Sequence, residues 1–214
     1  MDRRDRLRRA RLYLVVEVAG LGAARVALAG GVDMVQLRDK EAGDEEILGA
    51  ATAFRPACDE HGALFWLNDR PDLAMAAGAD GVHLGQADMP LPEARDLLGP
   101  DVLIGLSTHT PEQFDAALDS EADELSVGPV FETPTKAGRP AAGVDYVRYA
   151  AARGGSKAWF AIGGIDLDNV RDVLSAGAER IVVVRAIRDA ADPRAAAAGL
   201  RAALDEAAKD GPER

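Results

Sequence analysis

Eight short apolar segments recur along the chain, separated by stretches of helical length. The expected strands are 12–16, 34–37, 64–67, 81–84, 102–106, 125–130, 158–162 and 181–184. The expected intervening helices include 45–60, 92–98, 112–118, 144–152 and 169–176. Parallel strands need crossover helices, and right-handed crossovers can close the sheet on itself. The pattern therefore predicts an α/β protein with a single (β/α)8 TIM barrel, with a doubly wound open sheet as the alternative.

The length of 214 residues is that of one barrel, so we expect a single domain over 1–214. The only cysteine, Cys58, cannot form an internal disulfide, which indicates a reducing compartment. No stretch approaches the roughly 18 apolar residues of a membrane span, so we expect a soluble cytoplasmic protein without a membrane partner. The net charge of −11 repels nucleic acid. Any anionic ligand must then be held by a local group of cations.

A short phrase recurs before three of the expected strands: AGGVD at 29–33, AGAD at 77–80 and AGAE at 176–179. Each is typical of a helix that ends in glycine and turns into a strand. We interpret the repeat as architecture and not as chemistry.

Three polar side chains alternate in the phrase VQLRDK: Gln36, Arg38 and Lys40. In an extended strand they point to one face, and inside a barrel Arg and Lys are costly unless they meet an anion. Arg forms bidentate contacts with phosphate, and Lys supplies a compact charge. The pattern favours a diphosphate ligand over a neutral sugar.

Two carboxylates follow neighbouring strands, Asp69 after Asn68 in LNDR and Asp88 in GQADMP. We expect all three residues at the carboxyl ends of the strands, where barrel enzymes have their active sites. One or two carboxylates, completed by water and substrate phosphate, are how Mg²⁺ is commonly held. Ion pairs with nearby cations, or helix caps, are the alternative explanation.

The most irregular segment, 132–143, carries Thr133, Thr135 and Lys136, which suit phosphate or a polar ring but also occur in ordinary turns. Ser107 follows the fifth strand at the same end of the barrel. Gly164 in AIGGI follows the seventh strand, where backbone N–H groups of a barrel often bind phosphate. A tight βα turn is the alternative for this glycine.

The three histidines have no metal-ligand spacing. We expect His61 on the surface at a helix end, His83 inside the barrel with its hydrogen bonds satisfied, and His109 at the active end as a secondary candidate. No Ser/His/Asp arrangement is evident, and no nucleophile with a partner base is identified.

Six fragments together, VQLRDK, LNDR, GVHLGQAD, IGLSTHT, GPVFETPTK and AIGGI, resemble the thiamine phosphate synthase family in order and strand position. The resemblance covers nearly the whole chain. It implies a transferase of thiamine biosynthesis that joins 4-amino-2-methyl-5-pyrimidinylmethyl diphosphate to a thiazole phosphate. It also implies Mg²⁺ as cofactor and a dissociative step, in which diphosphate leaves before the thiazole nitrogen captures the pyrimidine cation. The partners are then small molecules, and a homo-oligomer remains open.

The resemblance assigns the residues as follows. Those expected on the pyrimidine diphosphate are Gln36, Arg38, Lys40, Asn68, Ser107 and Lys136, and the expected catalytic residues among them are Arg38, Lys40, Ser107 and Lys136. Asp69 and Asp88 are expected to bind Mg²⁺. Those expected on the thiazole phosphate are Thr133, Thr135, Gly164, Val184 and Arg185. Arg185 departs from the family pattern, which has a small hydroxyl residue there, so it either contacts the phosphate or pairs with Asp189.

Two other functions compete with this interpretation. A related thiazole tautomerase would carry a histidine where this chain has Pro129. A catalytically silent barrel that senses thiamine precursors would not need both Asp69 and Asp88. The full set of cations and carboxylates favours the synthase.

Overall fold

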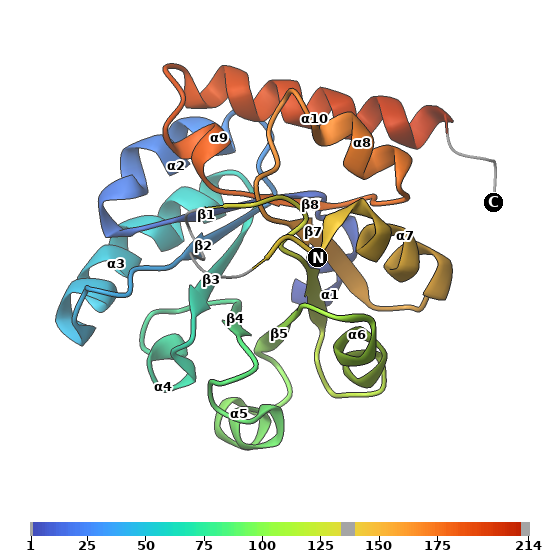
Figure 1. Ribbon diagram of the computed structural model, residues 1–214. Helices are drawn as coiled ribbons and strands as arrows, with labels where there is room; N and C mark the ends of the chain where they lie inside the picture. The colour runs from blue at the N-terminus through green and yellow to red at the C-terminus, as the bar shows by residue number, and fades with distance from the viewer. Residues whose placement is uncertain (1, 134–139, 211–214) are drawn as a thin grey trace.

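Eight parallel strands form a closed barrel in sequence order, with β8 paired to β1 (Figure 1). The computed structural model describes residues 2–133 and 140–210. The strands β1 to β8 are Leu12–Val16, Met34–Leu37, Leu64–Asn68, Gly81–Leu84, Leu103–Thr108, Glu124–Val127, Ala158–Ile162 and Ile181–Val183. The predicted (β/α)8 barrel is confirmed, and the open sheet is excluded.

Helices surround the barrel, as Figure 1 shows. They are α1 (Arg3–Arg9), α2 (Leu21–Leu28), α3 (Asp44–Glu60), α4 (Pro71–Ala74), α5 (Leu91–Leu98), α6 (Pro111–Leu118), α7 (Gly143–Arg153), α8 (Val170–Ser175), α9 (Arg185–Arg188) and α10 (Pro193–Asp210), with a 3-10 turn η1 at Val18–Gly20. The C-terminal α10 packs against α2, α8 and α9, which joins the two ends of the chain. Within the described ranges, no helix is both long and apolar enough to cross a bilayer.

Two strand ends differ from the prediction, and both differences affect the site. Strand β5 runs on to Thr108, so Ser107 is a strand residue and not a loop residue. Strand β6 ends at Val127, three residues earlier than predicted. Pro129 has no backbone N–H to continue a ladder, which explains the early end.

The apolar residues form two layers. The larger layer lies between the strands and the helices and includes Cys58, whose pKa burial raises to about 12, so the thiol is unreactive. The second layer fills the barrel interior around Tyr13, Trp66 and Phe160. The Tyr13 and Phe160 rings meet edge to face with centroids 5.6 Å apart. Leu7 of α1 belongs to this inner layer, so α1 closes the barrel at the amino ends of the strands, which we call the base.

Three aspartates directly before strands β2, β4 and β6 hold the base together: Asp33, Asp80 and Asp123. They accept hydrogen bonds from the backbone N–H groups of Leu12, Phe65 and Ile104, and from the guanidinium groups of Arg201, Arg55 and Arg95, respectively. Each therefore ties the start of the preceding strand to a helix. The recurring phrase serves the architecture at Asp33 and Asp80, as predicted, and Asp123 repeats the device.

Candidate active site

The carboxyl ends of the strands form the opposite edge of the barrel, which we call the rim. A cavity of about 40 Å³ opens there into the barrel interior, and we call it the inner cavity. Its lining residues are Tyr13, Val15, Gln36, Arg38, Asn68, His83, Ser126, Ile162, Val182 and Val184. Three predicted ligand residues, Gln36, Arg38 and Asn68, thus come together from β2 and β3.

Strand alternation orients Gln36, and it extends one residue past β2 to Arg38, whose backbone N–H still donates to the carbonyl oxygen of Val16 over 2.8 Å, but it does not reach Lys40. The Gln36 amide donates to the hydroxyl of Tyr13 over 2.5 Å inside the barrel. Burial, followed by the charge of Glu124, raises the pKa of Tyr13, so this hydroxyl stays neutral. The Arg38 side chain lines the inner cavity and forms no ion pair within the described part of the chain.

Lys40 lies beyond β2, which ends at Leu37, and its side chain is 61% exposed. The expectation that it points into the barrel interior is wrong, because a strand's alternation stops where the strand stops. Its ammonium nitrogen lies 3.9 Å from Asp69 Oδ2, a loose contact at the rim.

The two predicted metal ligands lie against each other. Asp69 has a φ of 59°, a left-handed conformation that is uncommon for a residue with a side chain. Burial, a hydrogen bond with the Asp88 carboxyl and the charge of Asp88 raise the pKa of Asp69, and Lys40 opposes this rise. The Asp88 Oδ2 also accepts the backbone N–H of Gly85 over 2.7 Å.

This arrangement resembles a divalent cation site more than an ion pair. A carboxylate such as Asp69, whose pKa is raised by burial and by a second carboxylate beside it, is stabilised in its charged form when a cation lies between the two. The described residues contain no group of three or more His, Cys, Asp or Glu side chains that could hold a metal alone. A site with two carboxylates fits Mg²⁺, which takes its remaining oxygen ligands from water and substrate phosphate.

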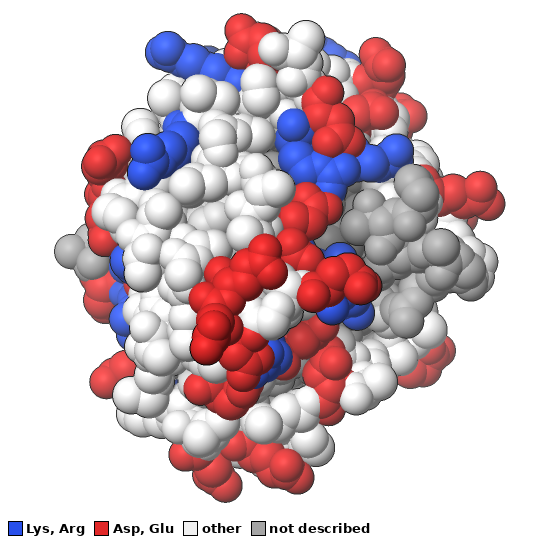
Figure 2. Space-filling view, turned by 90° about the vertical axis from the view of Figure 1, so that its left-hand side faces the viewer, with Lys and Arg blue, Asp and Glu red and all other residues white. Residues whose placement is uncertain are grey.

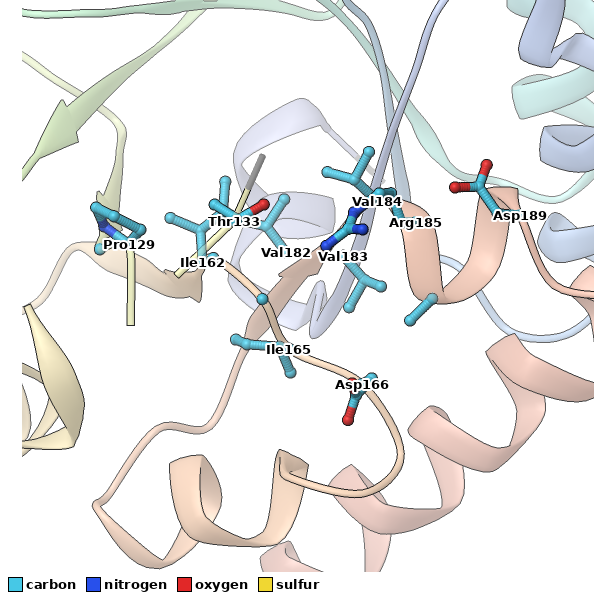
Figure 3. A pocket seen from close by; sticks show the side chains of 14 residues that line it. Pro129, Thr133, Ile162, Ile165, Asp166, Val182, Val183, Val184, Arg185 and Asp189 are labelled. Atoms are coloured by element: carbon cyan, nitrogen blue, oxygen red, sulfur yellow. The ribbon is translucent and has the colours of Figure 1, made fainter. Parts of the chain in front are cut away.

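A second cavity, of about 350 Å³, lies between the ends of β6, β7 and β8, and we call it the outer cavity (Figure 3). Its lining residues are Gly128, Pro129, Thr133, Ile162, Gly163, Gly164, Ile165, Asp166, Val182, Val183, Val184, Arg185, Ala186 and Asp189. It shares Ile162, Val182 and Val184 with the inner cavity, so the two cavities adjoin.

Gly164 forms a tight turn, which is one of the two explanations offered for this glycine, and phosphate binding there stays a prediction. Its φ of 67° belongs to a tight turn that favours glycine. A Cβ on Gly164 would also lie 2.8 Å from the Cβ of Phe131, so the turn packs closely on the segment after β6. The same residue lines the outer cavity with bare backbone.

Arg185 begins α9, and Figure 3 shows its guanidinium on the cavity side, beside Val183 and Val184. The alternative pairing with Asp189 is not formed, because both oxygens of Asp189 accept from Arg188 at 2.6 and 2.9 Å. The hydrogen bond from Arg188 lowers the pKa of Asp189. Arg185 itself makes no ion pair with any described residue and is available to an anion.

The molecule as a whole is acidic, so cations at the site can act only locally. The chain carries a net charge of −11, and Asp and Glu side chains clearly outnumber Lys and Arg on the face in Figure 2. An anion is therefore not drawn in by the molecule as a whole. The cations predicted to hold an anion, Arg38, Lys40 and Arg185, lie at the rim.

The remaining predicted residues fall into three groups. Thr133 lines the outer cavity, whereas Thr135 and Lys136 lie outside the described residues. His61 is exposed at the end of α3, as predicted. His109 lies 2.6 Å through Nδ1 from the carbonyl oxygen of Gly128, and neither cavity includes it among its lining residues.

The sequence interpretation missed one feature, an acid–imidazole–hydroxyl arrangement. His83 Nδ1 lies 2.9 Å from Glu124 Oε2, and His83 Nε2 lies 2.9 Å from Ser107 Oγ. His83 is satisfied inside the barrel, as predicted, but no Ser/His/acid arrangement had been found. The signal was available: in the buried segment ELSV, Glu124 and Ser126 are two apart and so share the inward face.

Comparison with known proteins identifies the relatives of this chain. Residues 12–187 match the family described as thiamine monophosphate synthase. Thiamine-phosphate synthase of Acidothermus cellulolyticus is 54% identical over 93% of this chain and 97% of its own length. The Thermus thermophilus protein of the same name is 54% identical over 91% and 97%. The structure of thiamine phosphate pyrophosphorylase from Pyrococcus furiosus superposes with a TM-score of 0.85 at 34% identity, covering 95% of this chain and 98% of that protein.

Proposed function

Because the chain belongs to the thiamine monophosphate synthase family, we propose that it is a transferase forming thiamine phosphate and diphosphate. The substrates are 4-amino-2-methyl-5-pyrimidinylmethyl diphosphate and 4-methyl-5-(2-phosphoethyl)thiazole or its 2-carboxy form. One observation carries the proposal. The inner cavity, which is lined by the side-chain amides of Gln36 and Asn68, adjoins the outer cavity, which is lined by Arg185. Because the two cavities share Val184, two substrates bound in them would be neighbours.

The pyrimidine ring is assigned to the inner cavity. The side-chain amides of Gln36 and Asn68 provide donors and acceptors for an aminopyrimidine, and the surrounding walls are apolar. Arg38 at the mouth of this cavity and Lys40 beside it direct the diphosphate towards the rim. The leaving group then separates among positive charges, which stabilise the negative charge that builds up on it.

Mg²⁺ is assigned to Asp69 and Asp88. When bound, it supplies positive charge to the diphosphate oxygens and makes diphosphate a better leaving group. The two carboxylates would hold it at the rim, near Lys40 and Arg38, so that positive charge gathers where the diphosphate leaves. No protein nucleophile takes part, because the pyrimidine ring stabilises the cation formed at the methylene carbon.

The thiazole phosphate is assigned to the outer cavity. The bare backbone around Gly164, with Thr133 on the neighbouring segment, suits the phosphate. Arg185 adds a charged contact from the start of α9, where the family pattern has a small hydroxyl residue. This contact fixes the thiazole so that its nitrogen faces the inner cavity, and alignment of this kind accelerates the bond-forming step.

The tautomerase alternative is not favoured. Pro129 stands where that enzyme would carry a histidine, and the proline ring that lines the outer cavity here has no group that could move a proton. A reducing compartment such as the cytoplasm suits the buried, unpaired Cys58.

A coupling assay tests the proposal. Purified protein is mixed with the pyrimidine diphosphate and the thiazole phosphate, with and without Mg²⁺, and thiamine phosphate and diphosphate are measured. Formation of both products only with Mg²⁺ is expected. Product formation that Mg²⁺ does not affect would contradict the metal assignment, and absence of product with ligand binding intact would favour the sensor.

A further inference from the structure

Three buried polar side chains on neighbouring strands form a chain of hydrogen bonds that the proposed reaction has not used. Glu124 on β6 is fully buried (0% exposed), and its Oε2 lies 2.9 Å from His83 Nδ1 on β4. The other ring nitrogen, Nε2, lies 2.9 Å from the hydroxyl of Ser107 on β5 and 3.5 Å from that of Ser126. Glu124 is thus linked through the His83 ring to a residue assigned to the pyrimidine diphosphate.

The barrel is built to hold this chain. Gly105 lies between its members, since the strand register pairs it with His83 on one side and with Glu124 on the other. A Cβ on Gly105 would lie within 3.0 Å of both Glu124 Oε2 and His83 Nδ1. Only a residue without a side chain leaves space for the contact between the imidazole and the carboxylate.

The chemistry of the groups determines how they are oriented. With the Glu124 carboxylate as the acceptor, the His83 nitrogen that faces it carries the hydrogen. In the neutral ring Nε2 then has the lone pair, the Ser107 hydroxyl donates to it, and the Ser107 oxygen is left to accept. A hydroxyl held in this way would receive an N–H group such as the amino group of the pyrimidine.

We propose that Glu124 is a positioning residue, which acts through the ring of His83 to orient the Ser107 hydroxyl at the pyrimidine end of the site. The inference rests on the proposed function, because it requires the pyrimidine diphosphate to bind beside Ser107. Among the described residues the Glu124 side chain hydrogen-bonds to His83, and its Oε1 is buried without a partner. Any hydrogen-bonded influence on the ligand therefore passes through His83.

The same order of groups activates serine in hydrolases, but a nucleophilic role is not proposed here. Ser107 is 2% exposed and belongs to neither cavity lining, whereas His83, at 8% exposed, lines the inner cavity. Because the proposed reaction needs no attacking oxygen, Ser107 is assigned only a hydrogen bond to the ligand.

A double-mutant cycle tests the proposal in the full-length enzyme. Glu124→Ala is measured in the wild-type background and in Ser107→Ala, following kcat, KM for the pyrimidine diphosphate and thermal unfolding. We expect Glu124→Ala to lower kcat/KM by about tenfold to a hundredfold in the wild type, and by less than about twofold in Ser107→Ala. Glu124→Gln, which keeps an acceptor for Nδ1–H, should restore most of the loss. Equal losses in both backgrounds would show a merely structural role and overturn the proposal.

If Glu124→Ala does not fold, two variants of His83 test the link between Glu124 and Ser107 instead. His83→Asn places an amide near the position of Nδ1 and keeps the Glu124 contact, whereas His83→Gln places one near Nε2 and keeps the Ser107 contact. We expect His83→Asn to behave like Ser107→Ala and not to add to it, and His83→Gln to be more active than His83→Asn. The reverse order of activity would contradict the proposal.

Failure of the proposed function gives a different result. If the wild-type protein forms no thiamine phosphate, the cycle is repeated on the dissociation constant of the pyrimidine diphosphate, measured by calorimetry. An effect of Glu124 that disappears in Ser107→Ala still supports positioning. An equal effect in both backgrounds, or no binding at all, overturns it.

Discussion

Charged side chains are arranged differently at the two ends of the barrel: the buried carboxylate at the base is surrounded by arginines, whereas the carboxylate at the rim lies beside another carboxylate. At the base, the Asp80 carboxylate is 4% exposed and contacts Arg55 at 2.6 Å, Arg3 at 3.0 Å and Arg6 at 3.1 Å. At the rim, Asp69 lies against another carboxylate, Asp88, and its cationic neighbour, Lys40, is 3.9 Å away.

This difference separates charges that maintain the fold from charges that remain available for the proposed ligands. A buried carboxylate surrounded by guanidinium groups is satisfied within the chain and has nothing left for a substrate. Adjacent carboxylates and unpaired arginines are unfavourable until a cation and an anion arrive. The rim therefore has binding capacity because it is not optimised for stability.

The largest effect is expected from removing the charge of Asp80. Asp80→Asn leaves three arginines at the base without their shared carboxylate, and breaking a buried ion pair of this kind costs about 3–5 kcal/mol of unfolding free energy. Urea denaturation measures the loss. Asp44→Asn is the control, because Asp44 pairs with Arg70 on the exposed surface and should leave the midpoint nearly unchanged. An equal loss in both variants would contradict the distinction.

At the rim we expect the opposite result, a loss of activity without a loss of stability. Asp69→Asn should lower kcat by about 10²- to 10³-fold, because the diphosphate loses charge stabilisation as it leaves. The variant should unfold no more easily than the wild type, since it removes one of two repelling carboxylates. Steady-state kinetics at saturating Mg²⁺ and thermal unfolding check both statements. Asp72→Asn, three residues further on and paired with Arg70, should retain its activity.

Arg185 at the outer cavity can be compared with an arginine that lies away from both cavities. Arg185→Ala should raise KM for the thiazole phosphate by roughly tenfold to a hundredfold with a smaller change in kcat, because a charge-assisted hydrogen bond contributes about 1.5–3 kcal/mol. Arg171→Ala is the control, because Arg171 of α8 pairs with Glu206 on the exposed surface and lines neither cavity. It should leave KM unchanged. Similar KM values in the two variants would refute a ligand role for Arg185.

The smallest effect is the pH dependence of stability, which should have opposite signs at the two ends. Burial and Asp88 raise the pKa of Asp69, so its contribution is complete below about pH 4 and is lost as the pH rises through the raised pKa. Burial by itself would raise the pKa of Asp80, but the hydrogen bond from Arg55 and the neighbouring contacts outweigh burial, so the pKa is lowered. Its contribution is present above about pH 4 and is lost as the pH falls through the lowered pKa.

Unfolding free energies of the wild type, Asp69→Asn and Asp80→Asn from pH 3 to pH 8 would separate the two signs. Mg²⁺ at ten times its dissociation constant should stabilise the wild type at pH 7 by about 1.4 kcal/mol and leave Asp69→Asn unaffected. Equal stabilisation of both would place the metal elsewhere.

Much of the rim could be predicted because strand ends of a barrel converge wherever they lie in the sequence. Gln36, Arg38 and Asn68 therefore line one cavity, as expected from their places at the ends of two strands. The prediction for Lys40 was wrong because the sequence pattern does not show where a strand stops. Thr135 and Lys136 remain predictions, since they lie outside the described residues.

The sequence by itself determined the barrel, because a strand–helix alternation repeated eight times can bury its apolar faces in few ways. It also determined which end carries chemistry, through the polar residues that follow the strands. Only the tertiary structure decided which charges are paired. Asp80 meets its arginines, and Glu124 meets His83, across distances in the chain that no local spacing encodes. Pairing depends on register and on the space left by Gly105, which exist only once the barrel has closed.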